Sequence, residues 1–266
     1  MPTHSSEAHH QRQMAESFGT DAERYDRARP RYPAELVNRI VAAAPGPAVL
    51  DVGCGTGIVA RQLQGAGATV HGVEPDERMA ELARRFGLEV DVATFEDWDA
   101  GGREFDAVVA GQAWHWIDPV AGAAKAARVL RPSGLLSAFW NALQLPPEMS
   151  SALVEACQRV IPDSPVDLTQ AFTKSAVEIY AAGLDKVAEG MHQAEAFDVP
   201  DRWRFDWEHT YTREEWLDQL PTFGILTRLP PEKLAELMDA LQPSLDQMGD
   251  SFTLPYSTLA ITAARR

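Results

Sequence analysis

The chain is poor in cysteine and in basic residues, and it contains no long apolar run. Its two cysteines, Cys54 and Cys157, lie far apart in the sequence and form no C-x-x-C pair. This excludes a zinc site or redox motif built on such pairs, and we expect no metal site. No stretch reaches the roughly 18 apolar residues of a membrane span. The polar start, MPTHSSEAHHQRQ, lacks the apolar core of a secretory signal. We therefore expect a protein of the reducing cytoplasm, without a membrane partner.

Positive charge is also scarce. The chain has 24 Lys and Arg against 39 Asp and Glu, a net charge of −15 over 266 residues. Such a surface repels phosphate backbones, which argues against a nucleic-acid partner. The one basic cluster, ERYDRARPRYP at positions 23–33, is short and contains acids. A small molecule is the favoured partner; the sequence does not distinguish a monomer from a homodimer.

The most informative motif that is present is VLDVGCGTG at positions 49–57. An apolar run ends in an acid, three glycines follow at alternate positions, and the start of a helix comes next. The glycines allow a sharp turn and the close approach of a ligand to the backbone. A dinucleotide fingerprint, G-x-G-x-x-G/A, requires a small residue where Ile58 stands. A nicotinamide-dependent oxidoreductase is therefore a weaker hypothesis.

Strand and helix patterns alternate through the first half of the chain. Strands are expected at 48–52, 69–73, 88–92, 105–110 and 135–140, and helices at 34–43, 58–64, 76–86 and 119–130. This alternation predicts an α/β fold whose parallel sheet carries helices on both faces. Ligands bind such sheets beyond the carboxyl ends of the strands, where the strand order reverses.

At the N-terminus we expect a disordered tail at 1–12, a short helix at 13–18 and an extended linker at 25–33. The alternation of strands and helices changes after about residue 145. The main core spans 13–144, a helical insertion or cap spans 145–201, and the C-terminal part of the core sheet spans 202–266. Within that last part, Trp203, Phe205 and Trp207 alternate as in a strand, and Thr212 with Glu215 forms a capping-box pattern. A helix at 232–245 and a strand at 251–263 follow.

The glycine motif resembles motif I of the class I S-adenosylmethionine (SAM)-dependent methyltransferases. The resemblance implies a Rossmann-like seven-stranded sheet of order 3-2-1-4-5-7-6, SAM as cofactor and S-adenosylhomocysteine as product. It places the cofactor against Asp51, Gly53, Gly55 and Gly57, and it assigns the acid in VEPDERM, Glu74, to the ribose hydroxyls. Other cofactor contacts are then expected from Pro75, Met79, Thr94, Phe95, Glu96 and Gln112, although core packing is an equal alternative for Met79.

ERYDRARPRYP, QAWHWID and the segment from Trp207 to Leu217 together resemble a narrower group, the small-molecule methyltransferases related to trans-aconitate and quinone-pathway enzymes. In that group a Tyr- and Arg-containing linker and inserted helices cover the site. The resemblance transfers no substrate. The expected substrate and lid residues are Tyr25, Arg29, Arg31, Tyr32, Trp114, Trp116 and Trp140.

His115 is the candidate catalytic residue, because an imidazole of ordinary pKa suits a general base at neutral pH. The alternative is that it only hydrogen-bonds its own loop or Asp118. A base is needed only if the methyl acceptor arrives protonated. The sequence thus predicts a SAM-dependent methyltransferase acting on a small molecule by in-line displacement. A non-catalytic SAM-binding protein is the second hypothesis, because intact motif residues do not exclude it.

Overall fold

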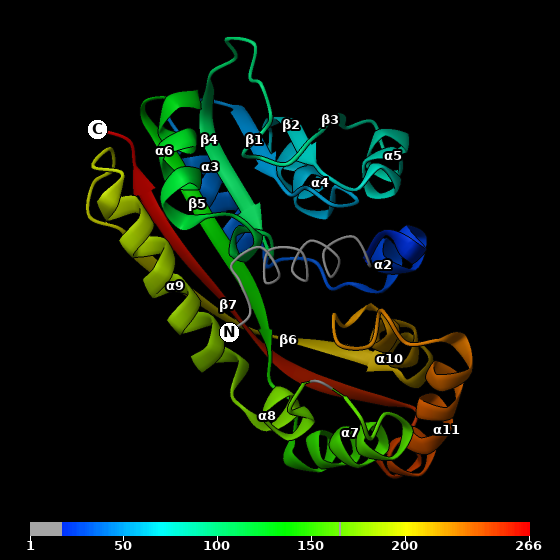
Figure 1. Ribbon diagram of the computed structural model, residues 1–266. Helices are drawn as coiled ribbons and strands as arrows, with labels where there is room; N and C mark the ends of the chain where they lie inside the picture. Colours follow the sequence, from blue (N-terminus) through cyan, green and yellow to red (C-terminus); the bar gives the residue numbers. More distant parts are fainter. Residues whose placement is uncertain (1–17, 165) are drawn as a thin grey trace.

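The protein is built on one seven-stranded sheet of order β3-β2-β1-β4-β5-β7-β6 (Figure 1). The computed structural model describes residues 18–164 and 166–266. The strands are β1 (Ala48–Val52), β2 (Thr69–Glu74), β3 (Glu89–Val92), β4 (Phe105–Gly111), β5 (Leu130–Leu143), β6 (Asp201–Thr212) and β7 (Ser251–Ala264). β7 runs opposite to the other six strands, which are parallel to one another. The predicted α/β class, Rossmann-like sheet and strand order are confirmed.

Helices cover both faces of the parallel part of the sheet. One face carries α3 (Ala34–Ala43), α4 (Ile58–Gly65) and α5 (Glu77–Arg85); the other carries α6 (Pro119–Val129) and α9 (Ala176–Gln193). Successive β1 residues alternate between the two cores: Val49 belongs to the core that contains Leu36 and Ile40, and Leu50 to the core that contains Ala123. Both faces of the strands are therefore buried, which explains their continuous apolar sequences.

A second lobe surrounds the far ends of β5, β6 and β7. It consists of α7 (Pro147–Val160), α8 (Leu168–Thr173), α10 (Arg213–Gln219), the short 3-10 helix η3 (Leu220–Thr222) and α11 (Pro231–Met248). These helices share a core that includes Leu153, Trp216 and Leu237. The region 202–266 therefore supplies half of this lobe as well as two strands of the sheet. None of the helices within 18–164 and 166–266 is long and apolar enough to cross a membrane.

The N-terminal segment connects the two lobes. A 3-10 helix, η1 (Phe18–Asp21), leads into α2 (Ala22–Ala28), which Asp21 caps by accepting from the backbone of Arg24 at 2.9 Å. The predicted extended linker is therefore wrong for residues 25–28. Pro30 forces only its predecessor out of the helix, and Arg29 is indeed extended. The expected tail at 1–12 and residues 13–17 of the expected first helix lie outside the described residues.

Helix α2 forms ion pairs with both lobes. Arg27 binds Asp218 of α10 through two hydrogen bonds of 2.8 and 2.9 Å, and Glu23 pairs with Arg85 of α5 at 3.0 Å. In Figure 1, α2 lies between the sheet above and the helices of the second lobe below. The segment predicted to act as a lid thus spans the space between the two lobes.

Candidate functional site

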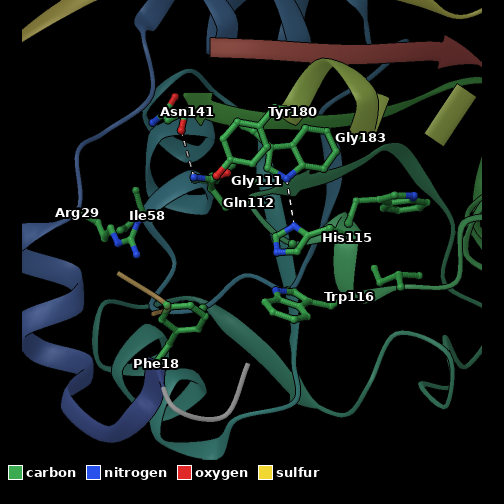
Figure 2. Close-up of a pocket in the computed structure, with 18 of the residues that line it drawn as sticks. Phe18, Arg29, Ile58, Gly111, Gln112, His115, Trp116, Asn141, Tyr180 and Gly183 are labelled. Atoms are coloured by element: carbon green, nitrogen blue, oxygen red, sulfur yellow. Dashed lines mark hydrogen bonds between the residues drawn. The ribbon is translucent and has the colours of Figure 1, made fainter. Parts of the chain in front are cut away.

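One large cavity lies at the carboxyl edge of the sheet, between the sheet and the second lobe. Its volume is about 1740 Å³, and residues from the ends of β1, β2, β3 and β4 form its floor. The strand order reverses between β1 and β4, so the cavity occupies the position where α/β sheets bind ligands. Figure 2 shows the side chains that project into it from β4, the loop after β4, β5 and α9.

The glycine loop between β1 and α4 has the left-handed backbone that glycine permits. Gly53 has φ +65° and Gly55 has φ +55°. A Cβ on Gly53 would lie 2.6 Å from the Cβ of Ala113, so packing alone demands glycine there. A Cβ on Gly55 would meet only the tip of Met79, at 3.7 Å. Gly55 therefore keeps its Cβ position open toward the cavity, as a backbone that receives a ligand requires.

Gly57 does not line the cavity, which departs from the predicted cofactor contact. It begins α4 with φ +82°, and a Cβ there would touch Leu88 and Ala83 at 3.4 and 3.5 Å. The third glycine of the motif thus serves the turn into the helix and its packing against α5.

Two buried carboxylates stand at the ends of β1 and β2. Both side-chain oxygens of Asp51 are buried without a hydrogen-bond partner. Burial, with a contribution from the charge of Glu74, raises the pKa of Asp51 to about 8. Glu74 accepts from the backbone N–H of Gly55 at 2.8 Å and of Asp76 at 2.9 Å, and burial raises its pKa to about 7. A buried carboxylate without partners fits a ligand that brings ammonium or hydroxyl donors.

The loop after β3 forms the next part of the cavity wall. Thr94 closes the loop by accepting from the backbone of Asp97 at 3.2 Å. Phe95 lines the cavity but is only 3% exposed, and its ring packs against Trp98 and Trp114. Glu96 is exposed at the cavity. Pro75 and Met79 also line the cavity, and Met79 is at the same time a buried core residue.

Gln112 lies at the end of β4 in a strained backbone conformation. Its φ is +57°, a value uncommon for a residue with a side chain. The backbone N–H bonds the carbonyl of Phe139 at 2.8 Å, and the side-chain amide N–H bonds the carbonyl of Asn141 at 3.4 Å (Figure 2). The Gln112 amide oxygen is buried without a partner. Strain of this kind gathers at functional sites, where it aims a side chain.

His115 is held by Trp140. The indole N–H of Trp140 donates to Nδ1 of His115 at 3.1 Å (Figure 2), so in the neutral ring the proton sits on Nε2. His115 is exposed at the cavity. The protein groups around the ring still displace part of its hydration, and this desolvation lowers the pKa of His115 to about 4. The lone pair that a base would use is already occupied. The expected partner Asp118 instead caps α6, accepting from the backbone of Val120 and Ala121.

The other expected residues divide between cavity and core. Trp116 lines the cavity; Trp114 and Trp140 also border it but are only 1% and 2% exposed and belong to the core. Among the lid residues, Tyr25, Arg29 and Tyr32 line the cavity. Arg31 does not, because it turns away to Asp26, 3.6 Å distant. The guanidinium of Arg29 lies between the rings of Tyr25 (5.1 Å) and Phe223 (5.7 Å) and donates to the carbonyl of Thr222.

Sequence reasoning missed the cavity residues that come from distant elements. They are Asn141 in β5, Lys174, Tyr180 and Lys186 at α9 and just before it, Gln219 and Phe223 near η3, and Tyr256 on β7. One signal was available: Asn141 interrupts the apolar run FWNAL at the end of a predicted strand. The others belong to no local motif. Within the described residues, no group of three or more His, Cys, Asp and Glu is placed to hold a metal ion.

Comparison with known proteins finds a methyltransferase domain in this chain. Residues 50–138 match the family model described as a methyltransferase domain. The chain is 28% identical over 261 residues to an uncharacterized methyltransferase of Mycobacterium tuberculosis, covering 95% of this chain and 97% of that protein. It is 39% identical over 97 residues to the ubiquinone biosynthesis O-methyltransferase of Thiobacillus denitrificans, which covers 34% of this chain and 42% of that protein.

A solved structure supports the fold. A protein of Anaeromyxobacter dehalogenans assigned as a type II methyltransferase aligns with a TM-score of 0.61 at 23% identity, covering 90% of this chain and 97% of that one. The matched range contains Asp51, the three motif glycines and Glu74 at the end of β2. Residues 50–138 thus form a methyltransferase domain, and the chain has the fold of the class I SAM-dependent methyltransferases.

Proposed function

We propose that this protein transfers the methyl group of SAM to a small-molecule acceptor inside the cavity. One observation carries the proposal: the carboxylate of Asp51 is buried, unpartnered and directed at the same cavity to which Gly55 presents an open backbone. A ligand with ammonium and hydroxyl groups satisfies Asp51 and takes up the remaining acceptor capacity of Glu74. Thr94, Phe95 and Glu96 then border the adenine, with Met79 and Pro75 on the other side.

When bound, SAM supplies a methyl group on a positively charged sulfur that is already a good leaving group. The chain therefore has to align the acceptor and exclude water. Gln112, with its strained backbone, and the wall of Trp116 and Trp140 are placed to hold the acceptor. His115 offers Nε2–H as a donor in this arrangement, because Nδ1 is engaged by Trp140.

A small acceptor is favoured over a polymer for two reasons. The cavity lies between two lobes and under α2, and a net charge of −15 repels nucleic acid. Both cysteines are free and buried, so we place the protein in the reducing cytoplasm.

Calorimetric titration of S-adenosylhomocysteine into the purified protein tests the proposal, with NADH as a parallel control. We expect one-to-one binding of S-adenosylhomocysteine alone, and binding about tenfold weaker or worse in Asp51→Asn. Binding of NADH instead would favour an oxidoreductase. Absence of S-adenosylhomocysteine binding by a folded protein would refute the site. A non-catalytic binding protein would bind the product but transfer no label from methyl-labelled SAM to any acceptor.

A further inference from the structure

Charge is divided unevenly along the wall of the cavity. Its acidic residues all come from the sheet side, where the cofactor is proposed to bind: Asp51, Glu74, Glu96, Asp97 and Asp118. From Trp140 to the C-terminus, the described lining residues include no Asp or Glu. They include Lys174 and Lys186, and Arg29 faces the same half from the end of α2. This half of the cavity therefore carries positive charge, although the chain as a whole, with 39 acidic and 24 basic residues, has a negative net charge.

These three cations have no carboxylate partner. Among the ion pairs of residues 18–164 and 166–266, none involves Arg29, Lys174 or Lys186. The Nε of Arg29 is buried without a hydrogen-bond acceptor, while the guanidinium is held between two rings. Lys174 follows α8 and Lys186 projects from α9, both exposed at the cavity. An anion entering the cavity meets positive charge that no protein carboxylate neutralises.

Apolar and aromatic side chains make up much of the rest of this half of the cavity, together with uncharged polar ones such as Asn141 and Gln219. Its wall is formed by Leu143, Leu145, Phe172, Ile179, Phe223 and Ile225, next to Trp140. Pockets of about 300–1,000 Å³ suffice for most small ligands. The cavity of about 1740 Å³ leaves room beside the cofactor for a sizeable acceptor. Apolar walls with cations fit a molecule that has an apolar body and an anionic group.

His115 adds a condition on the reacting atom. The hydrogen bond from Trp140 takes the Nδ1 lone pair, and the ring's Nε2–H has no protein partner among the described residues. His115 is therefore equipped to donate a hydrogen bond to an acceptor atom and is not equipped to remove a proton from it. An oxygen that is already ionised matches this donor and needs no base.

We propose that the methyl acceptor is an apolar acid and that its ionised oxygen, a carboxylate or an acidic phenolate, is methylated. This inference rests on the proposed function and deepens it. The acceptor oxygen forms the new O–C bond as the S–C bond of the donor breaks, and the electron pair stays on sulfur. The anion and the sulfonium become a neutral ester or ether and a neutral thioether, and no proton is released.

Two fluorescent probes test the charge preference on the complex with S-adenosylhomocysteine. 8-Anilinonaphthalene-1-sulfonate carries an anionic group on an apolar body, and N-phenyl-1-naphthylamine has the same rings without the charge. We expect the anionic probe to bind about tenfold tighter than the neutral one. Equal binding, tighter binding of the neutral probe, or no binding of the anion would overturn the proposal.

Charge-reversal variants localise the effect. Lys174→Glu and Lys186→Glu should each weaken the anionic probe about three- to tenfold and leave the neutral probe unchanged. Lys233→Glu is the matched control, because Lys233 lies on α11 outside the cavity and pairs with Glu236 at 2.8 Å. An equal effect of all three substitutions would mean that only the net charge matters, which contradicts the proposal. S-adenosylhomocysteine binding is measured in each variant as well. If it is retained while the charge effect is absent, the anion preference is refuted and the proposed function is not.

The methylated product identifies the reacting atom. After incubation with methyl-labelled SAM and a pool of carboxylic acids, phenols and amines with apolar bodies, label on oxygen supports the proposal. Release of the label by mild base identifies an ester and therefore a carboxylate acceptor, whereas base-stable label identifies a phenol ether. Label on nitrogen or sulfur overturns the proposal.

Discussion

Thr56 of the glycine loop donates its hydroxyl to Asp26 of α2, with 2.7 Å between the two oxygens. The same carboxylate oxygen accepts from Arg61 of α4 at 2.6 Å, and Asp26 is buried. Helix α2 is therefore fastened to the loop that we propose binds the cofactor, and Arg27 fastens its other side to Asp218 of the second lobe. The conformation of the glycine loop therefore depends on the position of α2 beside the cavity.

Asp26→Ala should both destabilise the protein and weaken cofactor binding. The substitution leaves the Thr56 hydroxyl and the Arg61 guanidinium without their shared partner. We expect a loss of about 2 kcal/mol in the free energy of unfolding, since a charged hydrogen bond in a partly exposed network is removed. Urea denaturation measures this loss, and calorimetry should show weaker S-adenosylhomocysteine binding.

The control for that variant is Glu23→Ala on the same helix. Glu23 pairs with Arg85 at the exposed surface, where an ion pair contributes little. We expect its unfolding free energy to stay within about 0.5 kcal/mol of the wild type, with unchanged S-adenosylhomocysteine binding. If Asp26→Ala behaves like Glu23→Ala, α2 is not coupled to the glycine loop.

Gly55→Ala separates ligand approach from backbone strain. Gly55 and Gly101 have φ values of +55° and +57°, and an added Cβ meets only the tip of Met79 at the first and nothing within 4 Å at the second. Both substitutions should cost about 1 kcal/mol of stability for the left-handed backbone. Only Gly55→Ala should lower S-adenosylhomocysteine affinity, by about tenfold or more, because its methyl group occupies the ligand's approach. Equal affinity in the two variants would argue against a ligand at Gly55.

Sequence patterns predicted the parallel half of the fold because its signals are local. The helix expected at 34–43 is α3, and the strand expected at 48–52 is β1. Each of these helices and strands ends near a glycine, a proline or an acid, and such residues influence the backbone only within a few positions. The sequence does not predict α2 because Pro30 and Pro33 favour an extended segment, whereas the steric effect of Pro30 reaches only Arg29.

The acceptor half of the cavity was beyond sequence reasoning because it forms only through long-range packing. Strands β5 and β7, each 14 residues long, run from one core into the other. Alternation along such a strand indicates a buried face and does not reveal that the face passes from one core to the next. Lys186, Gln219 and Tyr256 meet in one cavity only through that geometry. The nine-residue glycine motif, by contrast, forms its site within one turn.

Asp51→Asn should change how the stability of the ligand-free protein depends on pH. The folded protein keeps the Asp51 proton until about pH 8, whereas the unfolded chain releases it near pH 4. Folding therefore takes up a proton between these values, so the stabilisation is complete below about pH 4 and is lost as pH rises through 8. Relative to Asp51→Asn, the wild type should lose about 3.5 kcal/mol between about pH 5 and pH 8, since each pH unit in this range costs about 1.4 kcal/mol.

Urea denaturation across that pH range measures the effect, with Asp206→Asn as the control. The Ser257 hydroxyl and the Arg204 guanidinium lower the pKa of Asp206. Asp206 is therefore ionised in both the folded and the unfolded protein above about pH 5, and its contribution to the free energy of unfolding does not change over the range tested. The difference between wild type and Asp206→Asn should therefore stay constant from about pH 5 to pH 8. A constant difference for Asp51→Asn as well would mean that Asp51 is ionised and solvated in the ligand-free protein.

Trp140→Phe should make His115 easier to protonate. Desolvation lowers the pKa of His115 to about 4, and the indole N–H stabilises the neutral ring by donating to Nδ1. Removing that donor frees Nδ1 to take a proton, so the pKa of His115 should rise. Titration of the ring resonances by NMR measures it, with His115→Gln assigning the signal. A wild-type ring that titrates near its ordinary value of about 6.5 would restore His115 as a candidate base and remove its role as an Nε2–H donor.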